Sequence, residues 1–300
     1  MPTTSHVTLV EVGARDGLQN EDAILDTSTK VDLIRRLVGA GVSRIETASF
    51  VHPGRVPQMA DAEEVMADLG PSPSGVAYVG LVLNQRGLDR ALETTIDEVN
   101  FVISATEGFS QANQGAPVAA VMASIQEMVP VAAEAGLATA VTISVAFGCP
   151  YDGEVETEAV VSLARRAAEA GAQEIALGDT VGVAVPSDVT RLLEAVGEAV
   201  PETALRAHFH DTRNTGIANA YAAVASGVRT LDSSVGGAGG CPFAPNATGN
   251  VPTEDVLYML ERSGFVTGID REAVTATGIW LAGRLGKTLP SAIARAGGFP

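Results

Sequence analysis

Eight strand-like apolar runs, each followed by an amphipathic helical run at a repeat of roughly 30 residues, predict the fold class of this 300-residue chain. We expect an α/β protein, a (β/α)8 TIM barrel with additional C-terminal helices. The abundance of Ala, Val and Gly agrees, because strands of a parallel barrel are buried on both faces. An open doubly wound sheet also alternates strands and helices, but no GxGxxG sequence follows the first strand here.

The boundaries of the expected elements follow from hydrophobic periodicity and from glycines that end helices, such as Gly41, Gly136 and Gly171. Strands are expected over residues 7–12, 43–49, 76–83, 99–104, 139–147, 174–177, 205–210 and 230–235. Helices are expected over residues 30–40, 57–69, 87–95, 118–135, 158–170, 188–200, 215–226 and 253–262. We expect a single domain, 1–300, with the barrel over about 5–265 and the additional helices over about 266–300.

Composition excludes several classes of partner. The formal net charge of −17 argues against nucleic acid. No apolar run approaches the ~20 residues that span a bilayer, and the N-terminus lacks the features of a signal peptide, so no membrane partner is expected. Two cysteines, Cys149 and Cys241, do not suggest a disulfide framework. These features indicate a soluble cytoplasmic enzyme and leave a homo-oligomer, dimer or higher, open.

Candidate metal ligands lie at the ends of the first, seventh and eighth strands, which are neighbours in a closed barrel. His208 and His210 are two residues apart on one strand, so both imidazoles point to the same side. If that side is the barrel mouth, Asp16 and Asn250 would add oxygen ligands. Such a mixed set favours Mg²⁺ or Mn²⁺ over a zinc–thiolate site. The alternative is one hydrogen-bonded core histidine and one incidental histidine.

Two further groups have both a functional and a purely structural interpretation. Arg15 could stabilise an enolate oxygen, with Glu46 fixing its orientation, or the two could form a salt bridge that closes the barrel rim. The sequence GGAGGCP over residues 236–242 could be a long turn that needs positive φ angles. It could also be a lid that brings Cys241 over a substrate.

Six sequence blocks, in order along nearly the whole chain, resemble the 3-hydroxy-3-methylglutaryl-CoA lyase family. They are VEVGARDGLQNE (10–21), IETASFVHPGRVPQMAD (45–61), GCPYDG (148–153), LGDTVGVAVP (177–186), HFHDTRN (208–214) and DSSVGGAGGCPFAPNATGNVPTEDVLYML (232–260). The last block is highly specific. Its glycine loop with a cysteine is typical of the lyases rather than of the related Claisen-type synthases.

The resemblance implies a metal-dependent retro-Claisen cleavage of an acyl-CoA substrate, 3-hydroxy-3-methylglutaryl-CoA, to acetyl-CoA and acetoacetate in leucine degradation. It implies these roles: Asp16, His208, His210 and Asn250 as ligands of Mg²⁺ or Mn²⁺; His208 also in proton transfer; Arg15 on the enolate; Cys241 as acid–base group; Glu46 and Asp179 in support. A lyase for a related branched 3-hydroxyacyl-CoA, or a Claisen-type synthase, remains an alternative.

Two departures from the family pattern concern the substrate. Arg213-Asn214 stands where the family commonly has Tyr-Gly; an extra arginine at the barrel mouth could meet a carboxylate or a CoA phosphate, or the acyl group could differ from hydroxymethylglutaryl. The segment 53–55 (PGR) also differs, and we expect loops in that region to contact the CoA arm.

Overall fold

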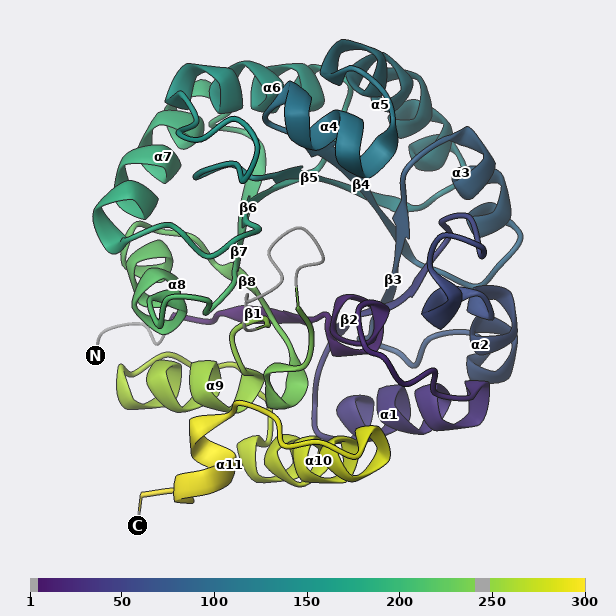
Figure 1. The fold of residues 1–300 in the computed structure, drawn as a ribbon, viewed down its shortest axis with the longest axis vertical. Helices are drawn as coiled ribbons and strands as arrows, with labels where there is room; N and C mark the ends of the chain where they lie inside the picture. Colours follow the sequence, from purple (N-terminus) through teal and green to yellow (C-terminus); the bar gives the residue numbers. More distant parts are fainter. Residues whose placement is uncertain (1–4, 241–248, 300) are drawn as a thin grey trace.

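A closed barrel of eight parallel strands, in the order of the sequence, forms the centre of the molecule (Figure 1). The computed structural model describes residues 5–240 and 249–299. The strands are β1 (Thr8–Glu11), β2 (Arg44–Ser49), β3 (Ala77–Val82), β4 (Glu98–Ser104), β5 (Ala138–Ser144), β6 (Glu174–Asp179), β7 (Ala204–Phe209) and β8 (Thr230–Ser233). Since β1 pairs with both β2 and β8, the barrel closes as the sequence predicted.

Helices surround the barrel, and two further helices pack outside that ring (Figure 1). The helices are α1 (Thr27–Gly39), α2 (Ala62–Leu69), α3 (Gln85–Leu92), α4 (Glu107–Gln114), α5 (Val118–Glu134), α6 (Thr157–Glu169), α7 (Pro186–Ala199), α8 (Gly216–Ala225), α9 (Thr253–Arg262), α10 (Arg271–Leu285) and α11 (Ala292–Ala296). Helix α4 was not predicted. Among the described residues no single helix is long and apolar enough to cross a membrane; α4 and α5, bent by 65°, pass that test only as a pair.

The apolar core lies between the strands and the helices, where side chains such as Leu33, Ile34 and Phe101 are fully buried. The inside of the barrel is different. Its lower part holds the ion-pairing side chains of Arg44 and Arg206, and its upper part opens into a cavity. The polar inner surface and the apolar outer surface follow from the alternation of side chains along each strand.

Two buried carboxylates join β1 and β8 to the start of α9. Glu11 accepts hydrogen bonds from the backbone of Gly13 and Val235 and from the hydroxyl of Thr253. Glu254 accepts the N–H of Gly236 at 3.0 Å. Burial raises the pKa of Glu11 to about 7. It raises the pKa of Glu254 to about 8, despite the opposing effect of backbone hydrogen bonds.

We expect Glu254→Gln to be more stable than the wild type at pH 8.5 and nearly equal to it at pH 4.5. The pKa of Glu254 is about 8 in the folded protein and 4.5 ordinarily, so folding favours the protonated form. Its contribution is complete below pH 4.5 and is lost as the pH rises through about 8, by on the order of 4 kcal/mol. Thermal unfolding of both proteins across this range measures the difference. Glu194→Gln, at an exposed position on α7, is the control, and a difference that does not vary with pH would contradict the prediction.

Candidate metal centre and substrate cavity

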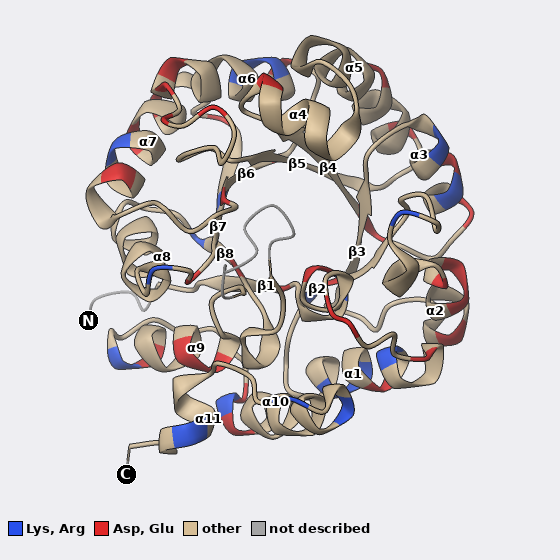
Figure 2. Cartoon of the chain, viewed as in Figure 1, with Lys and Arg blue, Asp and Glu red and all other residues tan. Residues whose placement is uncertain are grey.

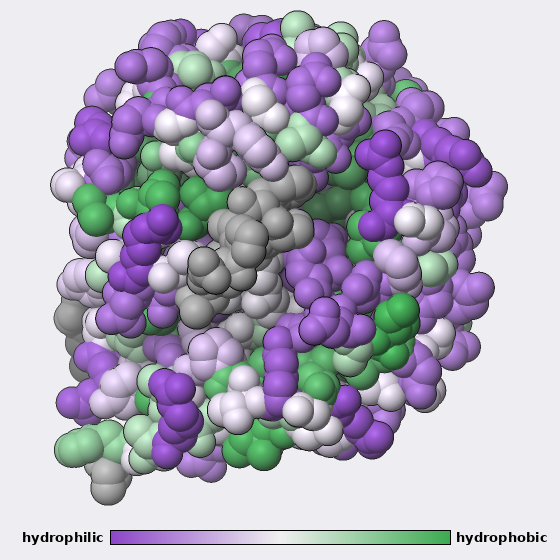
Figure 3. Space-filling model, viewed as in Figure 1, coloured by the Kyte–Doolittle hydropathy of each residue, from purple (hydrophilic) through white to green (hydrophobic). Residues whose placement is uncertain are grey.

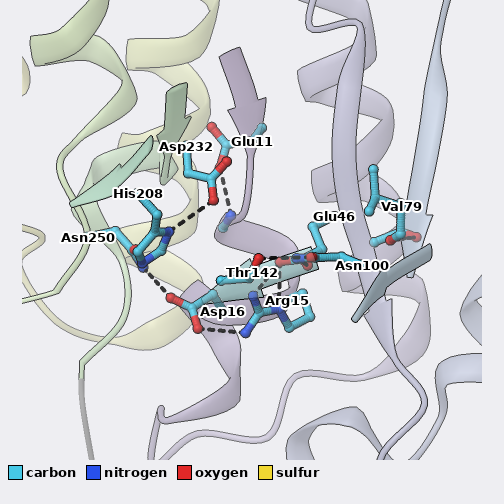
Figure 4. A network of polar contacts seen from close by, with 12 residues as sticks. Glu11, Arg15, Asp16, Glu46, Val79, Asn100, Thr142, His208, Asp232 and Asn250 are labelled. Carbon is cyan, nitrogen blue, oxygen red and sulfur yellow. Dashed lines mark hydrogen bonds and ion pairs between the residues drawn. The ribbon is translucent and has the colours of Figure 1, made fainter. Parts of the chain in front are cut away.

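Asp16, His208 and His210 gather at the carboxyl end of the barrel, where Figure 4 shows His208 and Asp16 facing one space. The potential ligand atoms of the three residues all lie within 4.8 Å of one another. The two imidazole rings are 5.1 Å apart between centroids, and Nε2 of His210 is 3.9 Å from Oδ2 of Asp16. Alternation along β7 and closure of the barrel therefore bring together the three residues that the sequence analysis grouped.

Asn250 completes this group. Its backbone pairs with His210, and its Nδ2 donates to Oδ2 of Asp16 at 2.8 Å and to the carbonyl of Ala238 at 3.2 Å. Its buried Oδ1 has no hydrogen-bond partner among the described residues, and neither has Nδ1 of His210. Buried polar atoms are rarely left unpaired, because each costs about 1–3 kcal/mol. The set of nitrogen and oxygen atoms, with these two unpaired, fits a divalent cation.

A tight turn at Gly13–Gly17 carries Arg15 and Asp16 into the site. The turn packs directly on the segment after β8: a Cβ atom at Gly17 would lie 2.9 Å from Oγ of Ser234 and 3.3 Å from the carbonyl of Ala238. Only glycine allows this approach. The same contact brings Asp16 within reach of Asn250, which follows the glycine-rich loop.

Arg15 is held between two carboxylates. Its Nη1 donates to Oδ1 of Asp16 at 2.6 Å and its Nε to Oε2 of Glu46 at 2.7 Å, while Asn100 supports the other oxygen of Glu46 at 3.1 Å (Figure 4). Burial alone would raise the pKa of Asp16, but the Arg15 guanidinium and the two imidazoles hold it well below its usual value. The guanidinium also lines the cavity. Both interpretations from the sequence thus remain compatible with the geometry, since an ion pair and a group facing the cavity coexist.

His208 has a partner that the sequence analysis did not assign. Its Nδ1 lies 3.0 Å from Oδ2 of Asp232, an inward residue of the adjacent strand β8. Burial lowers the pKa of His208, but the hydrogen bond and charge of Asp232 outweigh that effect and raise it overall. The signal in the sequence was the position of Asp232 at the end of a strand beside the His-x-His strand.

Two residues that the sequence analysis considered for the site bind backbone groups of the loop after β6. The carboxylate of Asp179 accepts the backbone N–H of Val183 at 2.9 Å and of Ala184 at 3.1 Å. The guanidinium of Arg213 donates to the carbonyls of Val181 and Gly182, both at 2.9 Å. Neither side chain lines the cavity. Both residues stabilise the loop after β6. Cys241 lies outside the described residues.

The cavity has a volume of about 1440 Å³ and two chemically different walls. The metal group lies on the side of β1, β7 and β8. The opposite side is an apolar cluster of Val51, Leu81 and Val102, packed against Val56 and Leu83. Figure 3 shows the hollow at the centre of this face, with hydrophobic side chains in its walls.

Basic side chains lie along part of the cavity wall, which also includes the acidic Glu63 and Glu64. His52 and Arg55 lie in the loop after β2, and Arg86 lies in the first turn of α3. Figure 2 marks basic residues along the ribbon of α3. The expectation that the 53–55 segment lies where it can contact an acyl-CoA arm agrees with this placement, since Pro53 and Arg55 line the cavity.

Comparison with known proteins gives consistent matches over the whole chain. A family model described as HMGL-like matches residues 6–279. The (R)-citramalyl-CoA lyase of Chloroflexus aurantiacus is 41% identical, with 97% of this chain and 95% of that protein covered. The 3-hydroxy-3-isohexenylglutaryl-CoA/hydroxymethylglutaryl-CoA lyase of Pseudomonas aeruginosa is 43% identical, with coverage of 97% and 96%. The crystal structure of the Bacillus subtilis HMG-CoA lyase is similar with a TM-score of 0.94 and 40% identity, covering 98% of this chain and 99% of that one.

Proposed function

This chain belongs to the HMGL-like family, and on that basis we propose that it is a divalent-metal-dependent carbon–carbon lyase that cleaves 3-hydroxy-3-methylglutaryl-CoA to acetyl-CoA and acetoacetate. The observation that carries the proposal is the group of Asp16, His208, His210 and Asn250 on the wall of a large cavity, with Arg15 beside it. The two relatives described above are named as lyases of acyl-CoA esters.

The charges of the barrel interior support a resident divalent cation. Three guanidiniums lie close to five carboxylates in two linked groups: Arg15 with Asp16 and Glu46, and Arg44 and Arg206 with Glu98, Glu174 and Asp232. With both imidazoles neutral, as ligands must be, these groups leave two negative charges unbalanced. A divalent cation held by Asp16, His208, His210 and Asn250 would neutralise them. The hard oxygen donors favour Mg²⁺ or Mn²⁺.

The reaction needs one proton removed, one bond broken and one proton returned. A bound cation would supply Lewis-acid polarisation of the substrate oxygens. A base beside the metal group takes the proton from the C3 hydroxyl; both ring nitrogens of His208 are engaged when Nε2 holds the cation and Nδ1 faces Asp232. The C2–C3 bond then breaks and C3 becomes the ketone carbon of acetoacetate. The electron pair of the broken bond passes into the enolate of acetyl-CoA. Arg15 stabilises the enolate oxygen, and Cys241 returns a proton to C2. No oxidant or water is consumed.

The arginines at the cavity edge would bind the phosphates of the CoA arm. Phosphates need local cations in a chain with a net charge of −17, and Arg55 and Arg86 lie at the cavity edge. The resemblance of the sequence to the lyase family supports the remaining proposals: a place in leucine degradation, a cytoplasmic location and assembly as a homo-oligomer.

A second candidate is a lyase for a 3-hydroxyacyl-CoA with a substituent at C3 larger than methyl. The apolar cluster of Val51, Leu81 and Val102 favours it, because a methyl group would cover little of that wall. The name of the Pseudomonas aeruginosa relative includes an isohexenyl ester beside the methyl ester.

We expect release of acetyl-CoA from 3-hydroxy-3-methylglutaryl-CoA when the purified protein is assayed with Mg²⁺ or Mn²⁺. The panel should include citramalyl-CoA and an ester with a long alkyl group at C3, with kcat/KM measured for each. Cleavage of a longer ester without cleavage of the methyl ester would favour the second candidate. Absence of turnover on every ester, with and without metal, would overturn both.

A further inference from the structure

We propose that Asp232 is the positioning residue of the metal ligand His208, and that its carboxylate, part of a buried ion network beneath the site, places a negative charge behind that imidazole. This inference rests on the metal centre proposed above. It assigns a task to five charged side chains inside the barrel that the cleavage reaction itself does not use.

The contact between the two residues fixes the imidazole. Nδ1 of His208 lies 3.0 Å from Oδ2 of Asp232, and the Asp232 side chain is 6% exposed (Figure 4). Pairing of β7 with β8 at Arg206–Thr230 and Ala207–Leu231 places the two side chains at neighbouring positions. A carboxylate that accepts the Nδ1 proton leaves Nε2 as the nitrogen with a free lone pair. Nε2 is therefore the nitrogen available to a metal, in a fixed ring orientation.

The ion network crosses the barrel below His208 and joins five strands. Arg44 contacts Glu98 at 2.7 Å and Glu174 at 2.8 Å. Arg206, which is 1% exposed, lies 3.4 Å from Glu174 and 3.8 Å from Glu98. Nε of Arg206 lies 3.3 Å from Oδ1 of Asp232. Oδ1 of Asp232 therefore faces Arg206 at ion-pair distance without a hydrogen bond, and Oδ2 meets His208.

The charges of this network do not balance. Two guanidiniums, Arg44 and Arg206, face three carboxylates, Glu98, Glu174 and Asp232. The network as a whole therefore carries one surplus negative charge, and Asp232 is the one of its three carboxylates that contacts His208. A carboxylate behind a ligating imidazole makes it a stronger donor to a cation. The network thus tunes the metal affinity and also fills the floor of the barrel.

The charge count predicts that Asp232→Asn folds normally. This substitution leaves two guanidiniums and two carboxylates, and the asparagine oxygen can still accept the Nδ1 proton. It removes the charge behind the imidazole and also turns an amide nitrogen, in place of Oδ1, toward Nε of Arg206. We expect the affinity for Mn²⁺ to be about 10- to 100-fold weaker, which is the usual effect of removing the hydrogen-bond partner of a metal-ligating histidine. Asp232→Glu keeps the charge and should recover part of the affinity.

Glu174→Gln is the matched control. It changes the charge of the same network by the same amount, but Glu174 contacts Arg44 and Arg206 rather than His208. Mn²⁺ affinity would be measured by electron paramagnetic resonance for the wild type and all three variants, with thermal unfolding to confirm folding. We expect weakened affinity in Asp232→Asn and an affinity within a few-fold of wild type in Glu174→Gln.

The possible contrary results are distinct. Equal Mn²⁺ affinities of wild type and Asp232→Asn would overturn this inference alone. An equal loss of Mn²⁺ affinity in Glu174→Gln would also overturn it. The network would then act on the metal site only through packing or through its total charge, and not through the contact of Asp232 with His208. A wild-type protein that binds no Mn²⁺ would overturn the proposed metal centre and this inference with it.

Discussion

Asp16→Asn should nearly abolish both Mn²⁺ binding and acyl-CoA cleavage. Asp16 is the carboxylate of the metal group, and Arg15 and Asn250 both donate hydrogen bonds to it. An asparagine lacks the charge and can accept fewer of these bonds. Loss of one partner from a buried charge pair costs about 3–5 kcal/mol, which corresponds to an affinity lower by on the order of 10²–10⁴-fold. Titration with Mn²⁺ and a turnover assay at saturating metal measure the two effects separately.

Cys241→Ala is the comparison for Asp16→Asn, because the two variants should differ in Mn²⁺ affinity. If Cys241 acts in proton transfer, its replacement should lower turnover and leave Mn²⁺ affinity unchanged. Arg15 keeps Glu46 as a partner in Asp16→Asn, so the fold should survive, and thermal unfolding would verify this. Wild-type Mn²⁺ affinity in Asp16→Asn would remove Asp16 from the ligand set. Full activity in Cys241→Ala would remove the cysteine from the mechanism.

The strands and their inward faces could be predicted from the sequence because period-two alternation is a local property. The placement of His208 and His210 on one side follows from it, and closure of the barrel then brings Asp16 to them. Helix α4 could not be predicted in the same way. Its eight residues, EGFSQANQ, are mostly polar and bury only Phe109 and Ser110, so they show no clear helical period.

Contacts between side chains of different strands were harder to predict from the sequence. The pairing of His208 with Asp232 depends on the register of β7 against β8, and a shift by one residue would turn Asp232 outward. The same holds for Arg206, whose partners come from β4, β6 and β8. No local pattern in the sequence contains that information.

The hydrogen bonds of Arg213 depend on local backbone conformation, which the sequence pattern does not contain. Asn214 has a φ of 58° and Gly182 a φ of 61°, both in the left-handed region. Between these two turns the Arg213 side chain lies against the carbonyls of Val181 and Gly182 instead of reaching into the cavity. The departure from the family sequence at this place therefore concerns the loop after β6. The apolar cluster at Val51, Leu81 and Val102 is the better candidate for the choice of acyl group.

Arg15→Lys should lower kcat by about 10²–10³-fold with little change in KM, the size of effect seen when a donor to a developing oxyanion is lost. The guanidinium contacts Glu46 through Nε and Nη2 and Asp16 through Nη1. These contacts use three of its five N–H groups and leave two for an oxygen in the cavity. A lysine keeps the charge but has no rigid fork, so it cannot hold both carboxylates and also face the substrate.

Metal affinity separates this effect from damage to the ligand group. Asn250 still donates to Asp16 in Arg15→Lys, so Mn²⁺ affinity should fall far less than in Asp16→Asn. Arg271→Lys, which alters an ion pair with Glu261 on the outside of the barrel, should have wild-type kinetics. A rise in KM at constant kcat would show that Arg15 binds the substrate and the transition state equally, and the enolate role would then be wrong. A loss of Mn²⁺ binding as large as that in Asp16→Asn would instead make Arg15 a residue that only positions Asp16.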